Sequence, residues 1–321
     1  MPAPRGPVTR KDVARFAGVS TAVVSYVVNE GPRKVAPQTR EKVLEAIRAL
    51  GYRPNATARA LRMGTTRTFG LITPDGGNPL FAELAKAIDR EAAARGYVVL
   101  QTSADGDPEI ENAKIAELLH RQVSGLVLVA PVHDPELDGV EVPLIAINRL
   151  LPKVSSVRPA YREGARLGVE HLISHGHRRI GLVIGGAGHP ERELGWRDAL
   201  ALAALPEGPI ARVEFSREGG YRAGQTMLHH EPTAIFVSSD LQAIGVLRAL
   251  HEAGVDVPGD IALVAFDGTP ETEYTWPPLT VVRQPVEGLA EEAVRRLIEG
   301  EDAVEALTVP TELIRRRSCG C

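Results

Sequence analysis

Five polar or charged side chains come just after apolar runs that are typical of strands. Asn148 follows PLIAI, Ser239 and Asp240 come after AIFV, Asp267 ends IALVAFD, and Arg192 begins the helix after RIGLVIGG. An amide, carboxylates and a guanidinium make paired hydrogen bonds. Such groups suit the adjacent hydroxyls of a neutral polyol. We therefore expect these residues to bind a small carbohydrate or a related metabolite.

Two phenylalanines, Phe81 in NPLFAEL and Phe215, are candidates for an aromatic wall against the apolar face of such a ligand. Ordinary core packing is the alternative for each phenylalanine. For Arg192 and Asp267 the alternative is an ion pair at the surface or between lobes. The sequence leaves these alternatives open.

A long alternation of short apolar strands and amphipathic helices positions these residues. From residue 68 onward, FGLIT, YVVLQTS, GLVLVA and PLIAIN alternate with helical patterns, and a second series runs from EGARLGVEHLISHG to IALVAFD. Each series predicts a doubly wound parallel sheet flanked by helices. Ligands bind beyond the carboxyl ends of such strands. The two lobes should form a cleft, and TVVRQP through VPTELIRRRS should cross back so that both lobes share chain segments.

A second surface is predicted in DVARFAGVSTAVVSYVVN, residues 12–29. Two short helices are expected here, the first beginning with a Thr9–Asp12 capping box and the second running from Ser20 to about Asn29. On a helical wheel, one side of the second helix carries Val23, Val24, Val27 and Val28 and the opposite side carries Thr21, Ala22, Ser25, Tyr26 and Asn29. In the first helix, Phe16 joins Val13, Ala14 and Ala17 in a shorter apolar pattern. Two short helices joined by a Gly-containing turn indicate a helix-turn-helix.

A third helix is predicted over residues 37–50, from Pro37 to a stop at Gly51. Its seam on the second helix should be Val43, Leu44, Ile47 and Leu50. Residues 1–62 carry a formal charge of +8 and the rest of the chain −12, which gives the whole-chain value of −4. A small basic unit joined to a large acidic one is typical of a protein that brings only its first part to a polyanion.

The N-terminal run T-x-x-D-V-A-x-x-A-G-V-S-x-x-x-V-S-x-V-x-N, from Thr9 to Asn29, resembles that of LacI-family transcriptional regulators. The resemblance implies that the second helix enters the major groove of DNA, with Thr21, Ala22 and Tyr26 reading base edges. Thr9, Ser20, Ser25 and Asn29 would then contact phosphates. Readout through Ala22 and Tyr26 would use apolar and hydroxyl contacts, including those to thymine methyls. The alternative for Tyr26 is that it covers the domain edge.

The segment YRPNATARALRMGTT has room for barely two helical turns, so a helix there needs a partner to persist. The family resemblance supplies one, because the hinge helices of two subunits would pair in the minor groove. Asn55, Ala58 and Arg59 would lie in that groove, and Leu61 would wedge between base steps. Packing of Leu61 on the next domain is the alternative.

The resemblance extends over nearly the whole chain through ERELGW, SSD, AFD and PPLTVVRQP, which are also similar to periplasmic sugar-binding proteins. It implies a homodimer that binds a palindromic operator and senses a small carbohydrate. The chain departs from the family at three positions. Ala36 replaces a Ser or Thr cap, Ser239 replaces an Asn, and Asn148 replaces an Asp. The last two changes leave the identity of the effector open.

The expected fold is an all-α helix-turn-helix head followed by a two-lobed α/β core. We expect a DNA-binding domain over residues 1–52, a hinge over 53–65 and an effector-binding and dimerisation domain over 66–321. No apolar run reaches the roughly 18 residues of a membrane span, and no signal peptide is apparent, so a cytoplasmic protein is expected. The only cysteines, Cys319 and Cys321, predict no disulfide framework. Their Cys-x-Cys tail could bind metal, but we expect a frayed end.

Neither of two competing functions explains the whole sequence. An enzyme would have to use GLVIGGAGHPE, residues 181–191, whose spacing matches no phosphate-binding motif, and no nucleophile elbow or histidine spacing with paired acids indicates catalysis or a metal. We therefore expect no catalytic residue, cofactor or metal. A carbohydrate-binding protein without DNA function would explain residues 68–318 but not the basic head.

Overall fold

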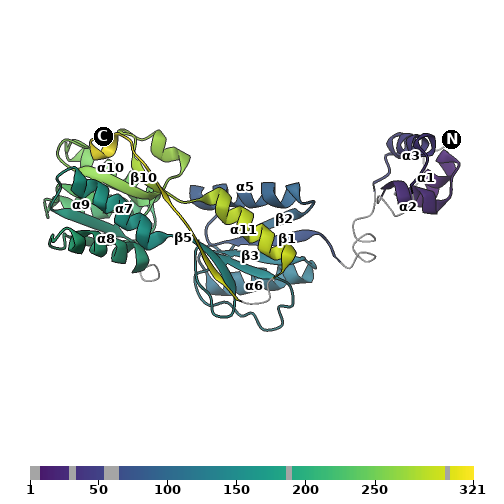
Figure 1. Cartoon of the computed structure of the whole chain (residues 1–321), viewed down its shortest axis with the longest axis horizontal. Coiled ribbons are helices and arrows are strands. Elements are labelled where there is room, and N and C mark those ends of the chain that lie inside the picture. Colours follow the sequence, from purple (N-terminus) through teal and green to yellow (C-terminus); the bar gives the residue numbers. More distant parts are fainter. Residues whose placement is uncertain (1–7, 29–33, 54–64, 186–189, 301–303) are drawn as a thin grey trace. The chain divides into compact units, whose positions relative to one another are not determined.

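A computed structural model describes residues 8–28, 34–53, 65–185, 190–300 and 304–321. The chain divides into two compact units between Thr66 and Arg67, and we describe each unit by itself. The N-terminal unit is helical, and the C-terminal unit holds two α/β lobes (Figure 1).

Three helices build the N-terminal unit: α1 (Arg10–Ala17), α2 (Thr21–Val28) and α3 (Pro37–Leu50). The predicted capping box between Thr9 and Asp12 is present, with the Thr9 backbone N–H donating to Asp12 Oδ2 at 2.9 Å, and the Thr9 hydroxyl also donates to that oxygen at 2.5 Å. Gly18 and Gly51 end α1 and α3 in the left-handed conformation, with φ of 65° and 64°. Ala36, the N-cap residue of α3, makes no side-chain cap because its methyl group cannot accept a hydrogen bond. The predicted helix-turn-helix is confirmed.

The core of this unit differs from the predicted one at two positions. Phe16, expected in the apolar pattern of the first helix, is 59% exposed, and Leu44, expected in the seam of the third helix, is 38% exposed. Ala46 is fully buried instead and packs with Val24 and Val43.

The first lobe, here the N-lobe, is a six-stranded sheet in the order β11-β5-β4-β3-β1-β2. Its strands are β1 (Thr68–Thr73), β2 (Val98–Ser103), β3 (Gly125–Val129), β4 (Leu144–Ile147), β5 (Ser155–Pro159) and β11 (Ala306–Val309). All pairings are parallel. One face packs on α5 (Pro79–Ala94) and α11 (Val286–Glu299), and the other packs on α6 (Pro108–His120).

The second lobe, here the C-lobe, is a six-stranded sheet in the order β12-β10-β9-β8-β6-β7. Its strands are β6 (Ile180–Ile184), β7 (Ile210–Arg212), β8 (Ala234–Val237), β9 (Ala262–Asp267), β10 (Thr280–Arg283) and the antiparallel edge strand β12 (Glu312–Ile314). Helices α7 (Tyr161–Ser174) and α8 (Pro190–Leu202) cover one face, and α9 (Arg217–Leu228) and α10 (Asp240–Glu252) cover the other. The expected doubly wound α/β lobes are confirmed.

The chain passes between the lobes three times. β5 leads into α7, β10 leads into α11, and β11 leads into β12 (Figure 1). β11 adds to the N-lobe sheet beside β5, and β12 adds to the C-lobe sheet beside β10. The expectation that both lobes share chain segments is confirmed.

The C-terminal residues are held, so the expectation of a frayed end was wrong. A short 3-10 helix, η1, spans Pro270–Glu273, and a second, η2, spans Arg317–Cys319. The Ser318 hydroxyl donates to the Leu263 carbonyl at 2.7 Å and accepts from the Thr280 N–H at 2.8 Å. Cys319 is only 1% exposed and belongs to the C-lobe core.

Among the described residues, no helix combines the length and apolar character that crossing a bilayer requires.

Candidate functional site

A cavity of about 430 Å³ lies between the two lobes, at the carboxyl ends of the parallel strands. Both lobes supply polar side chains to it. The N-lobe contributes Asp75, Asn78, Phe81, Asp105 and Asn148, and the C-lobe contributes Tyr161, Arg192, Phe215, Ser239, Asp267 and Gln284. The structure therefore brings six of the seven predicted effector-binding residues to one cavity.

Arg192 is fixed in the cavity wall by aromatic rings and a carboxylate. It lies on α8, and its guanidinium carbon is 4.4 Å from the ring centre of Tyr161 and 4.6 Å from that of Phe266. Its Nη2 donates to Asp267 Oδ1 at 3.3 Å. Rings on a guanidinium favour the cation and restrict its rotation. The predicted alternative of a surface or interlobe ion pair does not describe this contact, because both residues are buried and belong to the C-lobe.

Asp267 ends β9 with a φ of 114°. Its Oδ1 also accepts a hydrogen bond from Gln284 Nε2 at 2.6 Å. Burial raises the pKa of the Asp267 carboxyl from 3.8 to about 6, although Arg192 and Gln284 act in the opposite direction. The loss of hydration therefore destabilises the charged carboxylate more than Arg192 and Gln284 stabilise it.

Several buried polar atoms of this cavity lack partners among the described residues. Asn148 Oδ1, Gln284 Oε1 and Arg192 Nε are each buried and make no hydrogen bond there. Buried polar groups in proteins are almost always paired, with protein, water or ligand. Two acceptors and one donor are therefore available to a polar molecule in the cavity.

Phe81 and Phe215 both line the cavity. Phe81 also packs against the N-lobe core, so it meets the requirements of a wall and of core packing together. Phe215 lies 5.9 Å from the Arg192 guanidinium carbon, measured to its ring centre. A Cβ atom added to Gly185 would lie 2.0 Å from the Phe215 ring, so the glycine makes room for that ring.

Ser239 and Asp240 have local structural contacts. Ser239 lines the cavity and caps α10, since its hydroxyl oxygen accepts from the Gln242 N–H at 3.3 Å. Asp240 does not line the cavity. Its Oδ2 accepts from the Thr269 N–H at 2.6 Å and from the Thr269 hydroxyl at 2.9 Å. Burial, followed by the charge of Asp267, raises the pKa of Asp240.

Sequence reasoning missed Tyr161, Gln284 and Asn78. Gln284 directly follows β10, which pairs in parallel with β9, so the strand-end rule that indicated Asp267 could have found it. Asn78 caps α5 through a 3.0 Å hydrogen bond from the Leu80 N–H, ahead of Pro79. Tyr161 gave no comparable signal, because its role depends on Arg192 stacking across two helices.

In the N-terminal unit, Thr21 and Ala22 are exposed at the start of α2, and Ser25 and Tyr26 are half-buried beside them. The exposed Ser20 hydroxyl accepts from the Val23 N–H at 3.3 Å. Thr9 is exposed next to α1 and contacts Asp12. The predicted residues Asn29, Asn55, Ala58, Arg59 and Leu61 lie outside the described residues.

Comparison with family models gives two matches. Residues 9–55 match the lacI family of bacterial regulatory proteins, and residues 169–319 match a periplasmic binding protein-like domain. Among curated proteins, the HTH-type transcriptional repressor PurR of Klebsiella pneumoniae (strain 342) is 33% identical over 332 residues, which cover 97% of this chain and 96% of the relative. The Escherichia coli O1:K1 / APEC repressor of the same name shows the same identity and coverage.

Comparison with solved structures also gives matches to transcriptional regulators. The lac repressor dimer bound to operator and the anti-inducer ONPF matches with a TM-score of 0.85 and 30% identity, over 98% of this chain and 99% of that chain. The complex of the transcriptional regulator CelR with cellobiose matches with a TM-score of 0.72 and 29% identity, over 97% of this chain and 99% of that chain.

Proposed function

Because the chain belongs to the LacI family of bacterial regulatory proteins, we propose that it is a DNA-binding transcriptional repressor controlled by a small carbohydrate or a related metabolite. In this proposal residues 1–52 bind DNA, residues 53–65 form the hinge, and residues 66–321 bind the effector and dimerise. No catalytic step is assigned to the chain. Its relatives are repressors, and the cavity residues serve binding.

The DNA-binding part of the proposal rests on the exposed residues of α2 and on the formal charge of +8 carried by residues 1–62. Thr21 and Ala22 are exposed at the amino end of α2, where helix-turn-helix proteins contact base edges. We assign base readout to these two residues and Tyr26, and phosphate contacts to the hydroxyls next to them. A homodimer follows, since a single head contacts few bases. Two heads related by a twofold axis would meet major grooves about 34 Å apart on a palindromic operator.

The unpaired polar atoms of the cavity carry the effector part. Arg192 Nε, Asn148 Oδ1 and Gln284 Oε1 are buried and have no hydrogen-bond partner in the part of the chain that the structure describes, and they lie beside the Arg192–Asp267 pair and the Phe215 ring. A donor, two acceptors and an aromatic surface together match the alternating hydroxyls and apolar face of a sugar ring. The cellobiose complex of CelR, and the ribose-bound LacI-family regulator of Enterococcus faecium at 27% identity, support this ligand class.

The two activities would be coupled through the lobes. A ligand that contacts both lobes stabilises one arrangement of the lobes. That arrangement would determine whether the two hinge segments of the dimer pair or separate. Linkage then requires effector and operator to change each other's affinity equally, by about 1 to 3 kcal/mol, or about 5- to 150-fold. An effector that weakens operator binding releases the protein from DNA, and an effector that strengthens operator binding acts as a co-repressor.

The test uses the full-length chain. Operator duplexes are selected from a random pool, effectors are found by a thermal-shift screen of mono- and disaccharides, and calorimetry measures effector affinity with and without operator. We expect a several-fold difference in effector affinity, which Asp267→Ala removes by abolishing effector binding. Identical affinities would defeat the coupling. Retention of no duplex even at low salt would defeat the repressor proposal and leave a carbohydrate-binding protein.

A further inference from the structure

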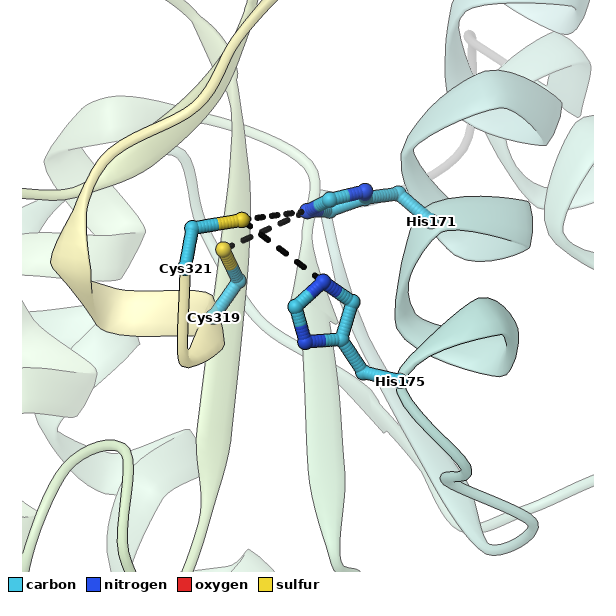
Figure 2. A group of neighbouring side chains, drawn as sticks. All are labelled: His171, His175, Cys319 and Cys321. Atoms are coloured by element: carbon cyan, nitrogen blue, oxygen red, sulfur yellow. Dashed lines mark hydrogen bonds between the residues drawn. The ribbon is translucent and has the colours of Figure 1, made fainter.

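Four potential metal ligands meet at one end of the C-lobe. His171 lies in the last turn of α7 and His175 caps that helix, while Cys319 ends η2 and Cys321 follows it (Figure 2). His171 Nε2 lies 3.3 Å from Cys319 Sγ and 3.4 Å from Cys321 Sγ, and His175 Nε2 lies 3.6 Å from Cys321 Sγ. All four ligand atoms lie within 4.8 Å of one another.

These distances correspond to those around a tetrahedral zinc ion. With Zn–S of about 2.3 Å and Zn–N of about 2.0–2.1 Å, neighbouring ligand atoms of a tetrahedron are about 3.4–3.8 Å apart. The three nitrogen–sulfur distances, 3.3, 3.4 and 3.6 Å, lie within about 0.1 Å of that range. The four ligand atoms lie within 4.8 Å of one another, so a tetrahedral ion could be bound after movements of about 1 Å in the pairs that are farthest apart.

The fold explains why the four side chains converge. Residues four apart lie on the same face of a helix, which places His171 and His175 together. Gly320 adopts a φ of 89°, so the chain turns between the cysteines, and both thiols face the histidines (Figure 2). Ser318 anchors this turn through its hydrogen bonds to Thr280 and Leu263.

Two features of the surroundings favour a cation. The carboxyl end of α7 carries the negative end of the helix dipole. The Thr280 hydroxyl lies 3.0 Å from Cys319 Sγ and can donate to a thiolate, as groups around metal ligands commonly do. Two thiolates and two neutral imidazoles would balance the charge of one Zn²⁺.

We propose that His171, His175, Cys319 and Cys321 bind one zinc ion that ties the C-terminal turn to α7. A set of two cysteines and two histidines fills all four positions of a tetrahedral ion, which is typical of structural zinc and leaves no place for a substrate. The site belongs to the C-lobe alone and is independent of the effector cavity.

The test begins with the untagged, reduced, full-length protein. We expect one zinc per chain after growth with zinc, measured by mass spectrometry of the metal. After removal of zinc with a chelator, cobalt(II) should restore one equivalent and give thiolate-to-cobalt charge-transfer absorption with the visible bands of a tetrahedral ion. Zinc far below one per chain together with no such cobalt spectrum would overturn the proposal, as would a Cys319–Cys321 disulfide in the protein from a reducing cytoplasm.

Variants assign the ligands. Cys321→Ser and His175→Ala change exposed residues, so the fold should survive, and each should lose zinc and the tetrahedral cobalt spectrum. His177→Ala is the matched control, because His177 is two residues away and contacts Thr233 at 3.2 Å instead. It should keep one zinc per chain. Full metal binding by both ligand variants would overturn the assignment, and if either fails to fold by circular dichroism, the wild-type cobalt spectrum decides.

Discussion

Arg192 and Asp267 form an ion pair at 3.3 Å in which each side chain is only 7% exposed. Two aromatic rings, of Tyr161 and Phe266, lie within 4.6 Å of the guanidinium carbon and keep it in place. A buried pair of this kind gains little net stability, because desolvation offsets the attraction between the charges. Both residues line the cavity, and in the proposed function they serve effector binding.

Arg192→Lys should weaken effector binding by about 10- to 100-fold, because an ammonium group keeps the charge but loses the planar fork that makes paired, charged hydrogen bonds. Calorimetry with the effector found in the screen measures the change. Arg197→Lys is the control, since Arg197 lies on the same helix but is paired with Glu207 at the surface. Equal affinities for the two variants would remove Arg192 from the binding site.

Asp267 should make stability depend on pH. Its folded pKa of about 6 is above the ordinary 3.8, so the protonated form stabilises the folded state fully below about pH 4, and this contribution is lost as the pH rises through 6. At 1.36 kcal/mol per pKa unit the loss is about 3 kcal/mol. The free energy of unfolding of Asp267→Asn minus that of wild type should therefore rise by about 2.4 kcal/mol from pH 4 to pH 7 in urea titrations, the part of the whole effect that falls in this interval. A constant or falling difference would contradict the pKa.

Gly185→Ala should weaken effector binding, because the new Cβ would lie 2.0 Å from the Phe215 ring and push that ring out of place. Overpacking of this size costs about 1–3 kcal/mol, so we expect a loss of effector affinity of about 5- to 150-fold. Gly288→Ala is the control, since its Cβ would meet only Val309 at 3.4 Å. An unchanged effector affinity in Gly185→Ala would show that Phe215 is not part of the wall.

Tyr26→Ala should reduce the preference for operator over random DNA by about 1 kcal/mol, or about fivefold, because a side chain on the base-reading face is lost. Binding to both duplexes is measured by fluorescence anisotropy. The control is Tyr274→Ala, an exposed tyrosine of the C-terminal unit. If the preference is unchanged, Tyr26 only covers the edge of the head.

DNA affinity should fall steeply with salt, because each phosphate contacted by Lys or Arg releases a counterion and contributes about −0.9 to the slope of log K against log[salt]. The basic head predicts a strongly negative slope for operator and random DNA alike. Anisotropy titrations at several salt concentrations give the slopes. A slope near zero would show that the head charge does not contact phosphates.

Local sequence patterns predicted most of the fold. Helices at Arg10–Ala17, Thr21–Val28 and Pro37–Leu50 follow from caps and periodicity, and the strand–helix alternation predicted both lobes. Strand β5, with the sequence SSVRP, was missed because it is short and polar, and it is recognisable as a strand only through its neighbours β4 and β11. Phe16 and Leu44 were misplaced because periodicity gives a face but not the space available on it.

Site residues were predictable where a local rule applied. Asn148 follows β4, Asp267 ends β9 and Arg192 lies on the helix after β6, and the strand-end rule brings them together. The zinc ligands show the limit of such rules, since His171 and Cys319 are 148 residues apart and neither segment alone has complete metal-ligand spacing. Only the path of the chain across the C-lobe brings the two pairs into contact.

The edge strands β11 and β12, residues 306–314, have a consequence for synthesis. β11 completes the N-lobe sheet beside β5, and β12 completes the C-lobe sheet beside β10. When a ribosome has made only the first 300 residues, β5 and β10 therefore still lack these neighbouring strands. Unpaired edges of this kind attract other chains. Assembly of both lobes therefore finishes together, after the final stretch has emerged from the exit tunnel, and a nascent chain stalled before it should depend on chaperones.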